Sequence, residues 1–240
     1  MADPAHVIDD SQRTAAKVAA LACLLSYAAV VFAEFGIRQR IMVPGDIARS
    51  IQQIAVDERL FRVGVALNVG YAVGVVVLVT ALYVILRPVS RHVALLATLW
   101  RLTTVVTWVL AVLGTLSVVH LASGADLQRL LQAEPVQGLV RLSGESVGDQ
   151  YYVGLAFWAL ASTACSYLWL TSGYIPRLLA GFGLVSSIWC AFCTLACIIA
   201  PGFADLVNLW WFDSPMAVFE LALSVWLLVK GLPRPEAARG

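Results

Sequence analysis

The stretch VGVVVLVTALYVIL, Val73–Leu86, decides the fold of this chain. It contains no charged side chain, and it belongs to a longer apolar segment, Phe61–Leu86, that can cross the ~30 Å hydrocarbon core of a bilayer as a helix. Its apolar residues are consecutive and do not alternate with polar ones. Because a lipid-exposed backbone must satisfy its own hydrogen bonds, this pattern predicts a transmembrane helix and not a barrel strand.

Five other segments have the same apolar character. They are Ala15–Phe35, Val93–Leu121, Tyr151–Leu170, Leu178–Ala200 and Pro215–Val229. Charged residues make up only 13% of the chain and hydrophobic residues 60%, a balance that a soluble domain rarely has. The sequence therefore predicts an all-α fold, an integral membrane bundle of six transmembrane helices in a lipid bilayer.

The bundle is expected to be a single domain over residues 15–230, with cytoplasmic tails at residues 1–14 and 231–240. Two short loops, Arg87–Arg91 and Thr171–Arg177, carry only positive charge, which favours a cytoplasmic location for them and for both termini. The chain is then a multi-pass protein of the cell membrane. Its net charge of +1 gives no indication of nucleic-acid binding.

The sixth segment is the shortest. From Pro215 to Val229 a helix rises only about 21 Å, less than the ~30 Å hydrocarbon core. Asp213-Ser214-Pro215 has the pattern of a helix start, with Ser214 as N-cap and Pro215 in the first turn. The aromatic residues of Leu209–Phe212 are then expected at the membrane interface.

A short amphipathic helix is predicted between the first two spans. Pro44-Gly45-Asp46 forms a turn in which Asp46 is a good N-cap. The apolar residues that follow share one helix face: Ile47, Ile51, Ile54 and Ala55. The loop Ser123–Gly148 has a weaker pattern of the same kind. Each element is expected to act as a structural lid, with a partner-binding surface as the alternative.

Arg101 and Glu220 are the charged residues that fall deepest within predicted spans. Arg101 lies ten residues after Arg91, and Glu220 lies ten residues before Lys230, so each is about 15 Å along its helix from the same boundary. An unpaired Arg or Asp at helix centre costs about 2.5–3.5 kcal/mol, which favours a direct pair. The pair either fixes how the third and sixth helices dock or marks a substrate or proton site at mid-depth.

Further charges gather at the predicted outer boundary. Glu34 and Arg38 are spaced i, i+4 at the end of the first span and can pair on one helix face. The others lie at the start of the second span and before the fourth: Arg62, Glu145 and Asp149. These residues are either ordinary interfacial charges or a polar mouth that leads towards the intramembrane pair.

A redox function has one weak candidate. Cys190 and Cys193 in the fifth span have C-x-x-C spacing, and Cys197 follows on the same helix face. The alternative is that these thiols pack as small apolar groups. Cys23 and Cys165 are isolated in the sequence, so no second pair is available as a relay partner.

Other catalytic, cofactor and metal motifs are absent from the sequence. It contains no phosphate-binding loop, no H-E-x-x-H and no G-x-S-x-G. The three histidines, His6, His92 and His120, all lie outside the fifth span, so its cysteines lack histidine partners for zinc. No catalytic residue, cofactor or metal is therefore expected, and an enzymatic activity is less favoured than a non-catalytic role.

Five segments carry a resemblance to known proteins: AEFGIRQRIMVPGD (Ala33–Asp46), LFRVG (Leu60–Gly64), ALYVILRPVSRHVALLATLWRL (Ala81–Leu102), SGYIPRLLAG (Ser172–Gly181) and FELALSVWLLVKG (Phe219–Gly231). In order and spacing they resemble the DUF4386 family, bacterial and archaeal six-helix membrane proteins without an assigned function. The resemblance covers nearly the whole chain and implies the six-helix fold but no activity. The family pattern also has Arg and Glu where this chain has Arg101 and Glu220, and it matches Arg62 and the Pro44-Gly45-Asp46 turn.

The chain departs from that pattern around the fourth span. The family tends to have a His and an Asp shortly before a Gly-Leu pair, and a second His inside the helix. Here those places are Val147, Tyr152 and Ala161. If the missing groups carry chemistry in relatives, this chain lacks it.

Three functional hypotheses follow, in order of preference. The first is a protein that binds or transports a small molecule or lipid within the bundle, around Arg101 and Glu220. The second is a structural or regulatory component that acts through another membrane protein. The third, well behind, is a membrane thiol or quinone oxidoreductase that uses Cys190 and Cys193.

Overall fold

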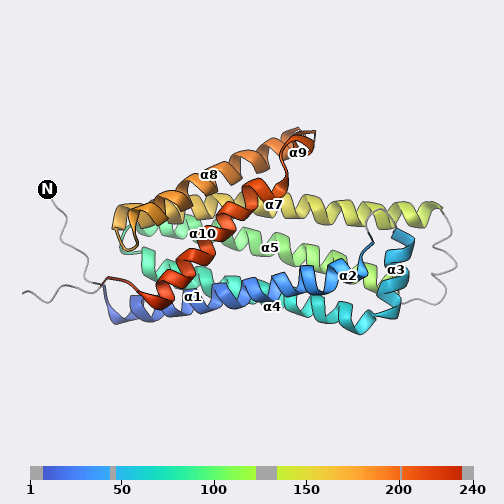
Figure 1. The fold of residues 1–240 in the computed structure, drawn as a ribbon, viewed down its shortest axis with the longest axis horizontal. Helices are drawn as coiled ribbons and strands as arrows, with labels where there is room; N and C mark the ends of the chain where they lie inside the picture. Colours follow the sequence, from blue (N-terminus) through green and yellow to red (C-terminus); the bar gives the residue numbers. More distant parts are fainter. Residues whose placement is uncertain (1–7, 44–46, 123–133, 201, 234–240) are drawn as a thin grey trace, which may run out of the picture. The chain divides into compact units, whose positions relative to one another are not determined.

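A computed structural model describes residues 8–43, 47–122, 134–200 and 202–233. Within these ranges the chain is helical and contains no strand. The elements, coloured along the chain in Figure 1, are α1 (Asp10–Val31), the π-helical segment η1 (Phe32–Arg38), α2 (Gln39–Ile41), α3 (Ile47–Val56), α4 (Glu58–Leu86), α5 (Arg91–Ala122), α7 (Glu134–Ser172), α8 (Arg177–Ile199), α9 (Phe203–Leu206) and α10 (Leu209–Val229).

Six helical stretches of the described chain are long and apolar enough to cross a bilayer. They are Asp10–Ile41, Glu58–Leu86, Arg91–Ser117, Gly148–Ser172, Arg177–Ile199 and Leu209–Val229. Each predicted span overlaps one of them, so the all-α prediction with six transmembrane helices is confirmed. The chain is a multi-pass membrane protein.

The start of the sixth span was predicted wrongly. Helix α10 begins at Leu209, where the Asn208 side-chain oxygen accepts a hydrogen bond from the Trp210 N–H at 3.0 Å. Asn208, and not Ser214, is therefore the N-cap, and Pro215 lies inside the helix. The resulting helix is about 31 Å long, enough to cross the hydrocarbon core.

The fourth span also extends further than its apolar core predicts. Helix α7 begins at Glu134, so the second part of the expected loop Ser123–Gly148 is helical. Residues 123–133 of that loop lie outside the described ranges, as do Pro44, Gly45 and the predicted cap Asp46.

The chain packs into two compact units. Unit 1 comprises Met1–Leu24, Gly74–Thr104 and Val153–Gly240, and unit 2 comprises Leu25–Val73 and Val105–Tyr152. Helices α1, α4, α5 and α7 each contribute a segment to both units. The candidate site described below belongs entirely to unit 1.

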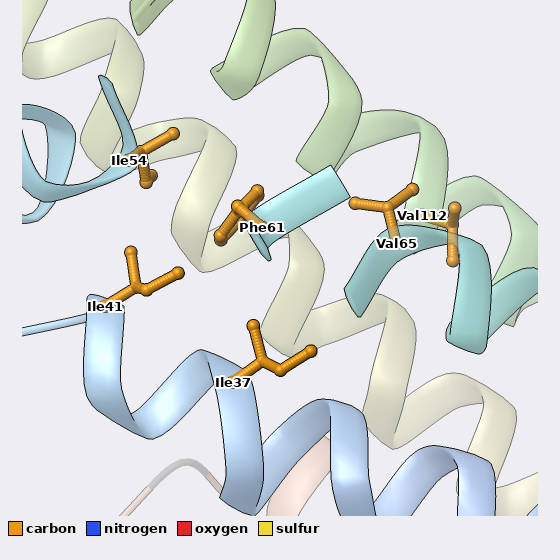
Figure 2. Packing of buried hydrophobic residues seen from close by; sticks show 6 residues of the cluster. All are labelled: Ile37, Ile41, Ile54, Phe61, Val65 and Val112. Carbon is orange, nitrogen blue, oxygen red and sulfur yellow. The ribbon is translucent and has the colours of Figure 1, made fainter. Parts of the chain in front are cut away.

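Unit 2 contains a buried apolar cluster built from four parts of the sequence, shown in Figure 2: Ile37, Ile41, Ile54, Phe61, Val65 and Val112. Ile54 comes from the predicted amphipathic helix α3 and is only 1% exposed, while Arg49 on the same helix is exposed. The start of α3 is held by Ser50, whose Oγ accepts from the Val43 N–H at 2.9 Å. The amphipathic helix between the first two spans is therefore confirmed, and its residue Ile54 packs in this cluster.

In unit 1, the start of α1 is fixed by reciprocal hydrogen bonds between Asp9 and Gln12. The Gln12 N–H donates to Asp9 Oδ1 at 2.7 Å, and the Asp9 N–H donates to Gln12 Oε1 at 3.1 Å. This is a capping box, with Asp in the place usually held by Ser or Thr. Gln12 Nε2 also donates to the Ile85 carbonyl oxygen at 2.9 Å, which joins the start of α1 to the end of α4.

Acid is expected to weaken this cap. Hydrogen bonds from the Gln12 N–H and the Ser11 hydroxyl hold the pKa of Asp9 below its usual value. A carboxylate with a lowered folded-state pKa stabilises the fold above its unfolded pKa of about 3.9, and this contribution is lost as the pH falls through the folded-state pKa. In melting curves recorded from pH 7 to pH 2, the wild type should therefore lose more stability than Asp9→Asn, whose amide caps without titrating. Parallel pH profiles would contradict this.

Candidate functional site

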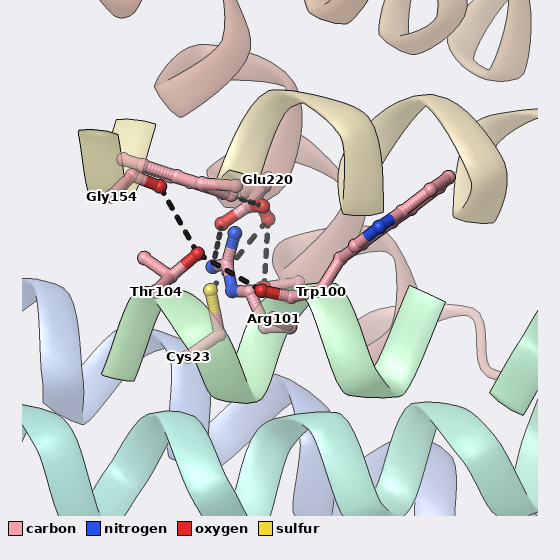
Figure 3. Close-up of polar contacts among 8 residues, drawn as sticks. Cys23, Trp100, Arg101, Thr104, Gly154 and Glu220 are labelled. Atoms are coloured by element: carbon pink, nitrogen blue, oxygen red, sulfur yellow. Dashed lines mark hydrogen bonds and ion pairs between the residues drawn. The ribbon is translucent and has the colours of Figure 1, made fainter. Parts of the chain in front are cut away.

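The centre of unit 1 contains a direct ion pair between α5 and α10. Arg101 Nη2 lies 2.9 Å from Glu220 Oε2, and the two side chains are only 7% and 12% exposed. Figure 3 shows the two side chains reaching towards each other from facing helices. The contact that their matching helix depth predicts is therefore present.

Trp158 of α7 completes the arrangement. Its indole Nε1–H donates to Glu220 Oε1 at 2.6 Å, and its ring lies under the Arg101 guanidinium, with Cζ 4.6 Å from the ring centroid. The indole thus contributes a hydrogen bond to the anion and a cation–π contact to the cation. We call these three residues the Arg101–Trp158–Glu220 cluster.

Sequence reasoning missed Trp158, although a signal was available. Transmembrane tryptophans favour the headgroup level, where the indole N–H meets water. Trp158 instead lies inside the predicted span Tyr151–Leu170, where a buried N–H needs a partner. A tryptophan inside a span therefore indicates a hydrogen-bond acceptor nearby. For Trp158 that acceptor is Glu220.

Polar contacts one helical turn away hold the same helices. Thr104 Oγ1, one turn beyond Arg101, donates to the Gly154 carbonyl oxygen at 3.1 Å and joins α5 to α7. Ser224 Oγ donates to the Glu220 carbonyl oxygen at 2.8 Å within α10. Figure 3 shows Thr104 and Gly154 beside the ion pair. Hydrogen bonds beside the cluster therefore join α5 to α7 and add a side-chain contact within α10.

The chemistry open to this cluster is limited. One positive and one negative charge balance, and each carboxylate oxygen accepts a hydrogen bond from inside the chain. Because Arg101 balances the charge of Glu220, a proton or metal ion on this carboxylate would weaken the ion pair. The arrangement is suited to orienting helices and to forming a neutral, polar wall.

A small cavity lies against this wall. About 40 Å³ of it is open to the centre of a water-sized sphere, which is room for about three water molecules or a compact group of similar size. Five helices surround it, and its lining is mostly apolar: Ala19, Cys23, Leu78, Val79, Leu82, Ala97, Arg101, Ala161, Ser162, Cys165, Trp169, Phe219, Glu220, Leu223, Ser224 and Leu227. Sequence reasoning identified Arg101 and Glu220 in this lining but not Ser162 or Trp169.

The charges predicted for an outer mouth lie in unit 2, where Glu34, Arg38 and Arg62 pair with residues one turn away. Glu34 Oε2 lies 2.9 Å from Arg38 Nη1, as the i, i+4 spacing predicts. Arg62 Nε lies 2.7 Å from Glu58 Oε1 on its own helix, a partner that the sequence analysis did not name. Asp149 is exposed, and the side chain of Glu145 is outside the described part of the chain. A polar mouth formed by these residues stays a prediction.

The cysteines of α8 are buried. Cys190 and Cys193 are 0% exposed and Cys197 is 7% exposed, and all three are free thiols. A thiol that exchanges disulfides must be accessible to its partner, so this burial favours the apolar packing alternative. Within the described ranges, no group of three or more His, Cys, Asp or Glu side chains could hold a metal ion.

The positions that depart from the family pattern are dispersed. Ala161 lines the cavity of unit 1. Tyr152 belongs to unit 2, where its ring centroid lies 6.2 Å from that of Tyr151. The side chain of Val147 is outside the described part of the structure.

Comparisons with known proteins give a family but no activity. No curated protein and no solved structure matches the chain. The model of one family, described as a domain of unknown function (DUF4386), matches residues 18–231. Because this match covers most of the sequence, and the six helices agree with the fold that the resemblance implies, the chain belongs to the DUF4386 family.

Proposed function

We propose that this protein binds or transports a small molecule or lipid inside unit 1, in the cavity beside the Arg101–Trp158–Glu220 cluster. The observation that carries the proposal is the cavity itself, which has mostly apolar walls and an ion pair on one side. Binding sites for small molecules are typically concave and apolar, with a few fixed polar groups. An intramembrane ion pair that borders a cavity fits that description better than one sealed in a packed core.

We also propose that the protein lies in the cell membrane with both termini in the cytoplasm. The support is the set of basic residues at one end of the spans. Arg87 and Arg91 follow α4 and begin α5, Arg177 begins α8, and Lys230 follows α10. Short loops with such residues are retained on the cytoplasmic side.

Filling the cavity tests the binding proposal. Ala97 lines the cavity and is 2% exposed, so Ala97→Val adds two carbons to its wall. Leu96→Val is the matched control, because Leu96 is 42% exposed on the same helix and does not line the cavity. The proteins are purified in lipid nanodiscs, and their lipophilic extracts are compared by mass spectrometry.

A molecule enriched with the wild type is expected to fall about tenfold in the Ala97→Val extract, equivalent to about 1.4 kcal/mol of binding free energy, and to stay unchanged in the Leu96→Val extract. The melting temperature of each variant is measured alongside. Equal amounts of every molecule in all three extracts would show that the cavity is not a binding site.

A second function has some support from the same cluster. Both Glu220 carboxylate oxygens are occupied within the chain, as expected of a structural or regulatory component in which the ion pair only fixes α5, α7 and α10. Such a component would act through another membrane protein. Cross-linking in native membranes should then recover one dominant partner, and recovery of only random neighbours would count against it.

A further inference from the structure

Three polar side chains form a buried stripe on α7. Ser162, Ser166 and Trp169 are spaced i, i+4 and i+7, which places them on one helix face. They are 5%, 0% and 0% exposed. The stripe begins one turn beyond Trp158, the α7 member of the ion-pair cluster.

None of these three polar atoms has a hydrogen-bond partner within the described part of the chain: Ser162 Oγ, Ser166 Oγ and Trp169 Nε1. This differs from the usual behaviour of hydroxyls in the spans. Thr98, Thr163 and Ser224 each donate to the carbonyl oxygen four residues earlier in their own helix. A buried donor without an acceptor is destabilising, so a donor in this state beside a cavity is a candidate for a partner from outside the chain.

Two of the three residues that carry these groups line the cavity. Ser162 and Trp169 belong to the same lining as Arg101 and Glu220. The remaining walls come from alanine, valine, leucine and phenylalanine side chains, with two cysteines and Ser224. The α7 side of the cavity therefore includes two residues that each carry an unpartnered polar atom, and both atoms are covered by neighbouring side chains. An occupant that is otherwise in apolar contact can bond to them when these side chains turn towards it.

The charge balance restricts that occupant. An anion would compete with Glu220 for Arg101, and a cation would compete with Arg101 and Trp158 for the carboxylate oxygens. In an apolar interior, either exchange leaves one charge without its partner. Of the two α7 groups, the indole can only donate and the hydroxyl can donate or accept. An uncharged group with an acceptor oxygen satisfies both without disturbing the pair.

We propose that Ser162 and Trp169 recognise the ligand and that this ligand is an uncharged, largely apolar molecule with a hydrogen-bond-accepting oxygen, such as a ketone or ester carbonyl. The carbonyl oxygen accepts from Trp169 Nε1–H and from Ser162 Oγ–H. This inference rests on the proposed function, that the cavity binds a small molecule. It adds the class of ligand and the residues that select it. The cavity volume admits a compact group of this kind, and a larger ligand would insert only its carbonyl end.

Three small probes of nearly equal shape test the ligand class. They are acetone, which has an acceptor oxygen, isobutene, which lacks it, and acetate, which is charged. Each is added to the wild-type protein in nanodiscs, and binding is measured by saturation-transfer NMR against protein-free nanodiscs. Infrared spectra of the acetone carbonyl stretch report hydrogen bonding directly, because donation to the oxygen lowers its frequency.

Acetone is expected to bind at least about tenfold more tightly than isobutene, because a site with buried donors rejects an analogue without the acceptor. Acetate should show no binding. Trp169→Phe and Ser162→Ala should each weaken acetone binding about fivefold or more and return the carbonyl stretch towards its unbonded frequency. Isobutene binding should stay the same in both variants. Ser186→Ala is the matched control, since Ser186 is buried but its Oγ donates to the Gly183 carbonyl oxygen and it does not line the cavity.

The outcomes separate the two proposals. Equal binding of acetone and isobutene, or unchanged acetone binding in both variants, overturns the ligand class and leaves a purely apolar site. If neither acetone nor isobutene binds, the proposed function itself is overturned. A high-resolution structure with a water molecule on Ser162 Oγ and Trp169 Nε1, retained in saturating acetone, assigns the acceptor to water and also overturns the ligand class. If one variant fails to fold, the other variant and the wild-type binding of the three probes still test the ligand class.

Discussion

Glu220→Gln is expected to lower the free energy of unfolding by about 3 kcal/mol. The substitution leaves the size and shape of the side chain nearly unchanged and retains an oxygen that can accept from Trp158. It removes the negative charge that balances Arg101, whose side chain is 7% exposed. Most of the loss of stability then comes from the Arg101 guanidinium, which remains charged in an apolar interior without a balancing anion. The change in the free energy of unfolding is measured in bicelles, with steric trapping as the readout of reversible unfolding.

The double variant Arg101→Met/Glu220→Met provides the control. Replacing a whole buried ion pair by apolar side chains of similar volume is often neutral or stabilising, because no charge remains to be desolvated. The double variant should therefore recover most of the stability that Glu220→Gln loses. A loss of similar size in both variants would show that the cost comes from packing around the cluster and not from the uncompensated charge.

Gly183→Ala is expected to destabilise the packing of α8 against α10 by about 1–3 kcal/mol. A Cβ atom at this position overlaps the ring of Phe219, which is 2% exposed and has little room to move. Glycine is needed here for close approach and not for its backbone freedom. Because Phe219 also lines the cavity, its displacement should weaken ligand binding as well as lower the melting temperature.

Gly181→Ala is the matched control on the same helix. A Cβ atom at Gly181 meets nothing within 4 Å, so only the helix preference of alanine remains, which is worth up to about 1 kcal/mol of stabilisation. The two substitutions should therefore shift the melting temperature in opposite directions. Adding Phe219→Leu to Gly183→Ala should recover part of the loss. Equal shifts for both glycines would refute a steric role for Gly183.

The sequence was a good guide wherever the cause is local. Consecutive apolar residues such as those of Val73–Leu86 must form helices in lipid, so the number and type of spans follow from composition and length. The contact between Arg101 and Glu220 also follows, because helix rise alone places them at equal depth and an unpaired charge is costly there. Local rules likewise predict the Glu34–Arg38 pair and the amphipathic helix α3.

Helix boundaries were less well predicted. Ser214 and Pro215 have the residue types of a helix start, but Asn208 caps α10 six residues earlier. Glu134–Gly148 is polar enough to suggest a loop, but it continues as helix α7. Before α10 both Asn208 and Ser214 have suitable capping chemistry, and which one is used depends on where the rest of the helix packs.

The sequence by itself determined that the chain lies in a lipid bilayer, where its helices span the bilayer, and that Arg101 and Glu220 pair. Each of these results depends on the properties of single residues or on their spacing along a helix. Only the tertiary structure decided that Trp158 joins the pair, that Gly183 faces Phe219, and that Ser162 and Trp169 line a cavity without partners. These facts depend on which helix faces meet and on which rotamer a hydroxyl adopts. Both are set by packing between segments far apart in the chain, and no local pattern encodes them.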